Sequence, residues 1–443
     1  MPLPNRFPLA HDLPHDELGQ TVKFVLLTQY YPPEVGGAPV LLSSLATELR
    51  RQGHDVRVIC TLPSYPTGRI FDGYTRRASV QEVREGIPVF RSWAYPSQSA
   101  EFFPRLANYF TFCLTSLLAY RWMSKPDVVF IDSPPLFLAL TALFLARAKG
   151  ARWIMNISDL WPDAVAEGGF VHSPILLGIA RRLEAFLYKH ADFVSAVTEG
   201  IVQTLAEEKT VPRSKLLFLP IGVDTDLFQP RPVDQPLLRA YNLTNKSIFV
   251  YAGILGHAQG LSLLLEAADA LRHRQDIALV LVGDGPEKAQ LKAERDQKGL
   301  SNVIFADPVP LTEMPRWWSV ARGALVTLKD QAVHQSARPS KSLPALASGV
   351  PVIFSGRGEM ARILSDAQAG VVVPPGQPTP LAESIIRLAD DGALARKLGE
   401  NGRRLCETDF GWRGVVQRWL EEMRSPSNSP TGFLATYSGA SQP

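Results

Sequence analysis

The chain has 443 residues, of which 46% are hydrophobic and 20% are charged, and its formal net charge at pH 7 is +3. This length exceeds one ordinary domain, so two α/β domains of about 150–200 residues each are expected, and the apolar content excludes wholesale disorder. The small net charge argues against a nucleic-acid-binding protein, because such proteins usually carry a strong basic stripe. Cys60, Cys113 and Cys406 form no CxxC pair. Neither a disulfide framework nor a structural zinc site is therefore predicted, and a reducing cytosol fits best.

Residues 1–20 are rich in proline and acidic residues and contain no apolar core segment, so they do not resemble a secretory signal. The Ser/Pro/Gly-rich residues 426–443 cannot bury a core. The predicted organisation is a mobile N-terminal extension (1–20), an N-terminal Rossmann-like domain (21–225), a linker (226–245), a C-terminal Rossmann-like domain (246–410), a final helix (411–425) and a disordered tail (426–443).

Short apolar segments alternate with helix-length segments through both halves of the chain, which is the pattern of doubly wound parallel sheets. Open sheets of this kind bind ligands beyond the carboxyl ends of their strands, so we expect two domains that face each other across a substrate cleft. The predicted strands are 23–29, 55–63, 127–134, 152–159, 192–199 and 215–224 in the first half, and 247–255, 277–285, 302–309, 323–330, 350–356 and 369–376 in the second.

Two longer apolar stretches, Phe110–Tyr120 and Leu136–Ala146, are 11 residues each, short of the ~18–20 that a transmembrane helix needs. Both are compatible with buried helices. The first is flanked by Arg105 and Arg121, a mixture that also suits a helix on a lipid surface, so peripheral membrane contact is left open.

Paired glycines precede the first predicted helix. Gly36 and Gly37 allow the backbone to approach a ligand closely, and the helix start offers N–H groups to a phosphate. A structural tight turn explains two glycines equally well, because the sequence does not match GxGxxG.

A second glycine-rich loop follows the first strand of the C-terminal half. Gly253, Gly256 and Gly260 surround His257 and Gln259, which again suits a phosphate, with His257 as a possible hydrogen-bond donor. The alternative is a surface histidine in a flexible turn.

The segment 337–359 carries a fixed positive charge at a predicted helix start. Lys341 is followed by Ser342 as a possible cap, and Arg338 can add to an anion site. Leu343 and Glu359, in the same segment, are also assigned to donor binding. The alternative is an ordinary helix cap with a solvated lysine.

Three aspartates, Asp132, Asp159 and Asp163, follow predicted strands, and Asp159 is the candidate for orienting donor or acceptor. Strand-end aspartates also cap helices, which is the alternative. The DxD sequence at Asp224–Asp226 lies at the linker, so no metal site is predicted.

Together these segments resemble the retaining glycosyltransferases of family four, which have the two-Rossmann GT-B fold. The resemblance runs from about Lys23 to Met423 and includes YYPPEVGGAP, SYPTGRIFDGY, DLWPDA, LFLPIGVDTDLFQP, VYAGILGHAQGL, LVGDGPE, PSKSLPALASGVPVI and AGVVVPPG. The second and third of these look like segments of the branch that builds colanic acid, capsule and O-antigen, and the fourth is similar to its hinge-side PNGVD stretch.

This resemblance implies a nucleotide-sugar donor, usually a UDP-sugar, on the C-terminal domain, and transfer with retention to a glycan or polyprenyl-linked acceptor without a metal or other cofactor. It implies a cytoplasmic enzyme at the inner face of the plasma membrane. Lys341, His257, the free amides at the helix start beside Lys341 and the Gly36–Gly37 amides would stabilise the departing diphosphate, and Asp159 completes the catalytic set. The N-terminal motifs place Glu34, Tyr65 and Trp161 on the acceptor side.

Four positions depart from the family pattern. Ser336 and Pro344 stand where many members carry glutamates, the second of which binds the ribose, and Ile221 stands where the hinge motif normally has asparagine. His257 replaces a common arginine. Two alternatives to a transferase therefore remain: a non-catalytic partner-binding subunit that keeps the fold, and a sugar-nucleotide epimerase.

Overall fold

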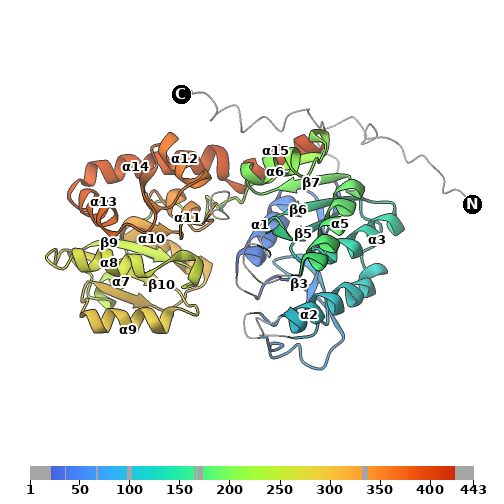
Figure 1. Cartoon of the computed structure of the whole chain (residues 1–443), viewed down its shortest axis with the longest axis horizontal. Helices are drawn as coiled ribbons and strands as arrows, with labels where there is room; N and C mark the ends of the chain where they lie inside the picture. The colour runs from blue at the N-terminus through green and yellow to red at the C-terminus, as the bar shows by residue number, and fades with distance from the viewer. Residues whose placement is uncertain are drawn as a thin grey trace, which may run out of the picture. The chain divides into compact units, whose positions relative to one another are not determined.

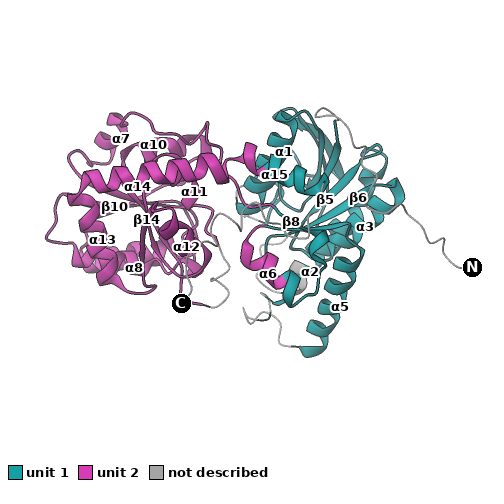
Figure 2. Ribbon diagram, turned by 90° about the horizontal axis from the view of Figure 1, so that it is seen from above, with its two compact units in different colours: residues 1–196, 205–218, 416–431 teal, residues 197–204, 219–415, 432–443 magenta. Residues whose placement is uncertain are grey.

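The structure is a computed structural model, and it describes residues 21–34, 36–65, 68–96, 102–163, 166, 173–331 and 338–424. The predicted N-terminal extension (1–20) and tail (426–443) lie outside the described residues. Ser336 and residue 425, the last of the predicted final helix, also lie outside them. The chain divides into two compact units (Figure 2): unit 1 comprises residues 1–196, 205–218 and 416–431, and unit 2 comprises 197–204, 219–415 and 432–443.

Unit 1 is built on an eight-stranded sheet with the order β3-β4-β2-β1-β5-β6-β7-β8. Every strand pairing is parallel except β3 with β4, which is antiparallel. All six predicted strands are present, but the prediction missed β3 and β4, because β3 is a polar edge strand whose side chains alternate between exposed and half-buried. The strands are β1 (Lys23–Leu27), β2 (Asp55–Thr61), β3 (Ser79–Arg84), β4 (Ile87–Ser92), β5 (Val128–Ser133), β6 (Arg152–Ile157), β7 (Phe193–Ala196) and β8 (Leu216–Phe218).

Helices cover this sheet, and α3 packs against β5 and β6 and contacts α2 and α5 (Figure 1). The final helix of the chain packs its Trp419 ring against Phe24 and Phe130, at centroid distances of 6.2 and 5.8 Å. The helices are α1 (Gly37–Arg51), α2 (Phe102–Thr115), the 3₁₀ turn η1 (Ser116–Tyr120), α3 (Leu138–Lys149), α5 (Pro174–His190) and α15 (Trp412–Arg424). Helix α6 (Glu199–Glu207) belongs mostly to unit 2, which includes residues 197–204. Among the described residues, none of the helices combines the length and apolar character needed to cross a bilayer.

Unit 2 contains a six-stranded sheet, entirely parallel, with the order β11-β10-β9-β12-β13-β14. This is the doubly wound order, in which successive strands are added first on one side of β9 and then, from β12 onward, on its other side. Ligands of such sheets bind at this switch point, between β9 and β12. All six strands predicted for this half are present: β9 (Ser247–Ala252), β10 (Ile277–Val282), β11 (Val303–Ala306), β12 (Ala321–Thr327), β13 (Val352–Ser355) and β14 (Gly370–Val373). The expected fold class, two Rossmann-like parallel-sheet domains in series, is confirmed.

The core of unit 2 lies where α8 and α13 pack on the sheet, around Phe249, Leu281 and Ile353. These strands are apolar on both faces because helices cover both faces. The helices are α7 (Gln235–Ala240), η3 (His257–Gln259), α8 (Ser262–Ala270), α9 (Lys288–Lys298), η4 (Leu311–Glu313), α10 (Met314–Val320), α11 (Ser342–Ala347), α12 (Glu359–Asp366), α13 (Pro378–Asp390) and α14 (Gly392–Leu405).

Candidate functional site

The switch point of unit 2 is occupied by the ammonium group of Lys341. Its Nζ donates a hydrogen bond to Tyr251 Oη at 2.7 Å and lies 4.5 Å from the centre of the Tyr251 ring. Tyr251 Oη in turn donates to the carbonyl oxygen of Ile254 at 2.7 Å. Tyr251 is on β9 and Lys341 follows β12, so neighbouring strands bring these two side chains together at the carboxyl edge of the sheet.

Glycines make room for this contact. Gly253 has φ +141°, and a Cβ atom placed there would lie 3.6 Å from Lys341 Nζ. A Cβ on Gly283 would lie 2.0 Å from the Gly253 carbonyl oxygen, and one on Gly285 would lie 2.4 Å from that of Leu255. The loops after β9 and β10 therefore touch through their backbones, which fixes the loop that faces Lys341.

Burial lowers the pKa of Lys341 to about 8, because desolvation disfavours the charged ammonium. No carboxylate lies within salt-bridge distance of Lys341 among the described residues. A cation held by a phenol rather than by a carboxylate retains its capacity to pair with an incoming anion. Such a perturbed group at a switch point is a candidate for ligand binding.

The other residues predicted in the first loop of unit 2 lie nearby but differ in surroundings. His257 is exposed and its Nδ1 lies 3.1 Å from Glu287 Oε1, while Lys329 Nζ lies 2.9 Å from its Nε2. Gln259 accepts a hydrogen bond from Thr327 Oγ1 through its carbonyl oxygen at 2.6 Å. Gly260 has φ +60°, which ends the short turn η3. His257 is therefore a surface group with an acidic and a basic neighbour.

Arg338 and Glu359 form a buried ion pair within unit 2. Arg338 Nη1 lies 3.6 Å from Glu359 Oε1, and Arg338 also donates to the carbonyl oxygen of Val197. Burial raises the pKa of Glu359, an effect that Arg338 opposes. Both residues were predicted to bind the donor, and the structure shows them bound to each other.

The start of α11 differs from the prediction. Lys341, not Ser342, is the N-cap residue, and Ser342 Oγ is buried without a hydrogen-bond partner among the described residues. The amides of Ser342 and Leu343 already donate to the carbonyls of Pro339 and Ser340, so the expectation of free N–H groups at these two residues is wrong. The Leu343 side chain is buried in the core. The candidate anion-binding group is thus the Lys341 ammonium and not the backbone amides at the start of α11.

In unit 1 the carboxyl ends of β5 and β6 hold a polar cluster. Asp132 Oδ1 accepts hydrogen bonds from Asn156 Nδ2 at 2.7 Å and from Ser158 Oγ at 2.6 Å. Desolvation raises the pKa of Asp132 to about 6, and these hydrogen bonds oppose the rise. Asp159 is exposed to solvent, yet the neighbouring protein partly desolvates its carboxyl and raises its pKa. Asp159 thus projects from this edge, as predicted, beside a second carboxyl that the prediction left unassigned.

Trp161 lies near this cluster, with its ring 5.8 Å from that of Phe137. Asp163 has a different role, because it pairs with Lys209 and Arg181 in unit 1. These cations lower the pKa of Asp163. It is a structural ion-pair partner.

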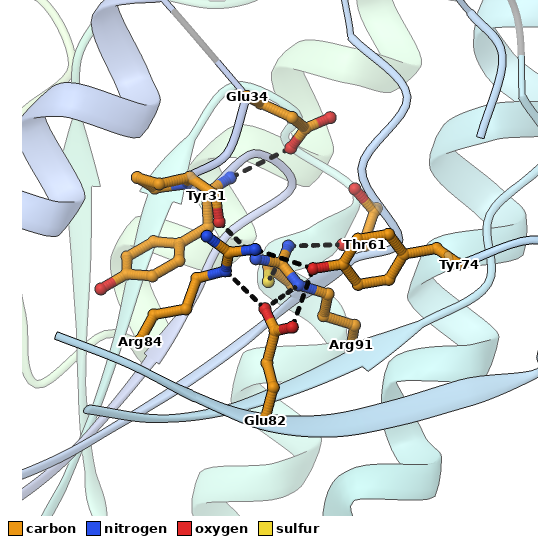
Figure 3. A network of polar contacts seen from close by, with 9 residues as sticks. Tyr31, Glu34, Thr61, Tyr74, Glu82, Arg84 and Arg91 are labelled. Atoms are coloured by element: carbon orange, nitrogen blue, oxygen red, sulfur yellow. Dashed lines mark hydrogen bonds and ion pairs between the residues drawn. The ribbon is translucent and has the colours of Figure 1, made fainter. Parts of the chain in front are cut away.

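The loop after β1 is held by Glu34. Its carboxylate accepts a hydrogen bond from the backbone N–H group of Tyr31 at 3.2 Å (Figure 3). It also accepts from the N–H groups of Ser64 and Tyr65, at 3.0 and 2.9 Å. Desolvation raises its pKa, which these bonds oppose. The buried Glu34 therefore positions two loops, and Tyr65 is left half exposed at the edge. Gly36 is the N-cap of α1 and Gly37 its first residue, so the helix begins one residue earlier than predicted.

Sequence reasoning missed a network centred on Arg91 in β4. This fully buried guanidinium donates to Glu82 Oε1 at 2.7 Å, to the carbonyl of Thr61 at 3.1 Å and to that of Pro32 (Figure 3). Tyr74 Oη donates to Glu82 Oε2 at 2.8 Å. An arginine inside the apolar segment IPVFRS was the available signal, because a charge in a buried strand needs partners.

Two doubly wound units, one with a desolvated lysine at its switch point and the other with carboxyl groups at its own strand ends, have the architecture of a two-domain GT-B type protein. Residues 36–222 match the family described as Glycosyl transferase 4-like domain, and residues 236–405 match Glycosyl transferases group 1. The chain belongs to these glycosyltransferases.

Similar proteins agree with this assignment. WcaI of Escherichia coli K12 is named as a colanic acid biosynthesis glycosyl transferase. It is 30% identical over 408 residues, which cover 89% of this chain and 98% of that protein. A GDP-mannose-dependent α-(1-6)-phosphatidylinositol monomannoside mannosyltransferase of Mycolicibacterium smegmatis is 26% identical, with 90% and 97% coverage. The Anabaena HepE structure in complex with UDP has the same fold, with a TM-score of 0.69, 16% identity, and 91% and 100% coverage.

Proposed function

We propose that this glycosyltransferase takes a sugar from a nucleoside-diphosphate donor, a UDP-sugar, and transfers it with retention of anomeric configuration to a glycan or polyprenyl-linked acceptor in cell-surface polysaccharide synthesis. The observation that carries the proposal is the Lys341 ammonium at the switch point of unit 2, held by Tyr251 and facing Gly253. UDP in the similar Anabaena structure supports a uridine donor, whereas the mannosyltransferase relative makes GDP the main competitor.

In this proposal the diphosphate lies against Lys341. Negative charge grows on the diphosphate as the glycosidic bond to the sugar breaks, so a cation already in place stabilises the transition state more than the ground state. The lysine takes the part that a divalent metal takes in other transferases, and the reaction proceeds without a metal. Asp159 orients the reacting groups from unit 1. We place the enzyme in the cytoplasm, at the inner face of the plasma membrane.

The test is calorimetric titration of the purified chain with UDP, GDP, ADP and TDP, repeated with Lys341→Ala. Loss of a charge-assisted contact costs about 1.5–3 kcal/mol, so we expect affinity to fall by about 10- to 150-fold. Lys397→Ala, which changes an exposed lysine on α14, is the matched control and should bind as the wild type does. Chelation of divalent cations should leave the affinity unchanged.

Binding of no nucleotide would favour the second candidate, a non-catalytic subunit. The specific observation for it is Pro344, which offers no carboxylate on α11 where many relatives bind ribose. Selective binding of one nucleotide, lost in Lys341→Ala, would support the transferase and identify the donor class.

A further inference from the structure

The outer faces of α2, η1 and α3 carry large apolar side chains that no part of the described chain covers. Phe110, Leu114 and Leu118 recur every four residues along α2 and η1, and Leu114 and Leu118 are 69% and 58% exposed. Leu140 and Phe144 repeat the same spacing on α3, where Phe144 is 57% exposed. Side chains four residues apart lie on one side of an α-helix, so Phe110 with Leu114 and Leu140 with Phe144 form apolar stripes on α2 and α3, and Leu118 follows the first stripe on η1.

The two stripes lie side by side. The Phe110 ring is 4.8 Å from that of Phe137, at the start of α3, and Lys149 Nζ at its end lies 3.9 Å from the centre of the Tyr120 ring. Contacts at both ends mean that the helices run in the same direction. Figure 1 shows α2 and α3 as neighbours. We call the surface formed by these stripes the α2–α3 face.

Charge on the α2–α3 face has one sign. Residues 102–126 and 136–151 include no Asp or Glu, although about a quarter of an ordinary protein surface is charged with both signs mixed. The C-terminal ends of the stripes carry Arg121, Lys125, Arg147 and Lys149. A second copy of the chain would bring like charges together, which disfavours self-pairing, whereas an anionic surface complements both the apolar stripes and the cations.

Helix α5, which contacts α3, has the same composition. Ile175, Ile179 and Phe186 are exposed, and Arg182 and Lys189 are its neighbouring cations. Its one acidic residue, Glu184, is buried and bound to Lys209 and Tyr188. The cationic, apolar character therefore extends beyond the two stripes.

We propose that the α2–α3 face docks on a lipid bilayer rich in anionic headgroups. The apolar stripes enter the interface, and the cations contact the headgroups. The Phe110 and Phe137 rings lead to Trp161, two residues after Asp159, at the carboxyl edge of the sheet. If the proposed function holds, a polyprenyl-linked acceptor can therefore keep its tail in the bilayer while its sugar reaches Asp159. The docking itself does not depend on that function.

The test is flotation of the full chain with vesicles of phosphatidylcholine alone and with 30% phosphatidylglycerol, without nucleotide sugar (about 0.15 M salt). We expect binding to the anionic vesicles, weakened by 0.5 M salt. Leu118→Glu/Phe144→Glu should reduce the partition coefficient at least about 10-fold. Arg121→Gln/Lys149→Gln should reduce it about 25-fold, since each cation near an anionic surface contributes about fivefold.

The matched control is Leu311→Glu, which adds a charge at an exposed leucine on η4 of unit 2 and should leave vesicle binding unchanged. Lys149 is half-buried beside the Tyr120 ring, whereas the other residues changed are exposed. Unchanged UDP titration and thermal unfolding would establish that all variants fold. Absence of binding to anionic vesicles overturns the proposal, as does binding that Leu118→Glu/Phe144→Glu retains. A wild-type dimer that this double variant converts to a monomer would also overturn it. These results bear on the proposed membrane location but not on nucleotide binding or sugar transfer, which nucleotide titration tests separately.

Discussion

The protonation of Lys341 makes nucleotide affinity depend on pH in a calculable way. Its folded pKa of about 8 lies below the ordinary lysine value of 10.5, so the ammonium is mostly protonated at pH 7 and mostly neutral at pH 9. The protonated fraction falls from about nine-tenths to about one-tenth over this interval. If only the protonated form binds the diphosphate, the affinity for UDP falls about 10-fold as pH rises from 7 to 9.

Isothermal titration across pH 7–9 measures this fall. The terminal phosphate of the nucleotide is already ionised there, since its second pKa is about 6, and the raised pKa of Tyr251 keeps its phenol neutral. Lys341→Arg should retain binding with little pH dependence, because arginine stays protonated. Wild-type affinity that is flat from pH 7 to 9, or a Lys341→Met variant that keeps the full 10-fold fall, would refute the reasoning.

Four further predictions follow from the described contacts. Arg338→Met leaves Glu359 buried without its cation and should lower the free energy of unfolding by about 3–5 kcal/mol in urea titrations. The double variant Arg338→Met/Glu359→Gln should regain most of this loss. Equal stability of the single and double variants would contradict the ion pair. Tyr251→Phe removes the acceptor of the Lys341 hydrogen bond and should cost about 1 kcal/mol of stability and weaken UDP binding in calorimetry, and unchanged values for both would count against the contact. Gly253→Ala places a methyl group beside the ammonium at a positive φ, so thermal unfolding should show a loss of about 1–3 kcal/mol together with weaker UDP binding; an unaltered variant would show that the loop is not constrained. Asp159→Asn should lower the rate of sugar transfer at least about 100-fold with UDP affinity unchanged, and full activity would remove Asp159 from the mechanism.

Much of the fold could be predicted, because buried parallel strands are continuous apolar segments with little ambiguity. All twelve segments predicted as strands are strands. The β3–β4 hairpin was missed since one of its strands is a polar edge, and its partner carries the buried Arg91, whose stabilising network joins side chains distant in sequence. Such partners are set by tertiary structure and not by local pattern.

The sequence predicted where the candidate site residues lie along the strands and loops, but not which groups their side chains contact. Spacing placed Lys341 and Gly253 after strands, and the sheet order then brought them together. The same spacing placed Arg338 and Glu359 on the donor side, where the structure pairs them with each other. Glu34 was assigned to the acceptor, but its carboxylate binds three backbone amides that no sequence pattern connects. Whether a polar group faces a ligand or its own protein depends on contacts between loops.

Sugar transfer itself tests the central claim most directly. The purified chain is incubated separately with UDP-glucose, UDP-galactose, UDP-N-acetylglucosamine and GDP-mannose together with a lipid extract of its native membrane, and mass spectrometry follows the lipid-linked glycans. We predict that a UDP-sugar adds one sugar to an acceptor, with release of an equal amount of UDP, and that Lys341→Ala abolishes the product. Tight binding of UDP with no transfer from any of these donors would contradict the account and indicate a non-catalytic protein.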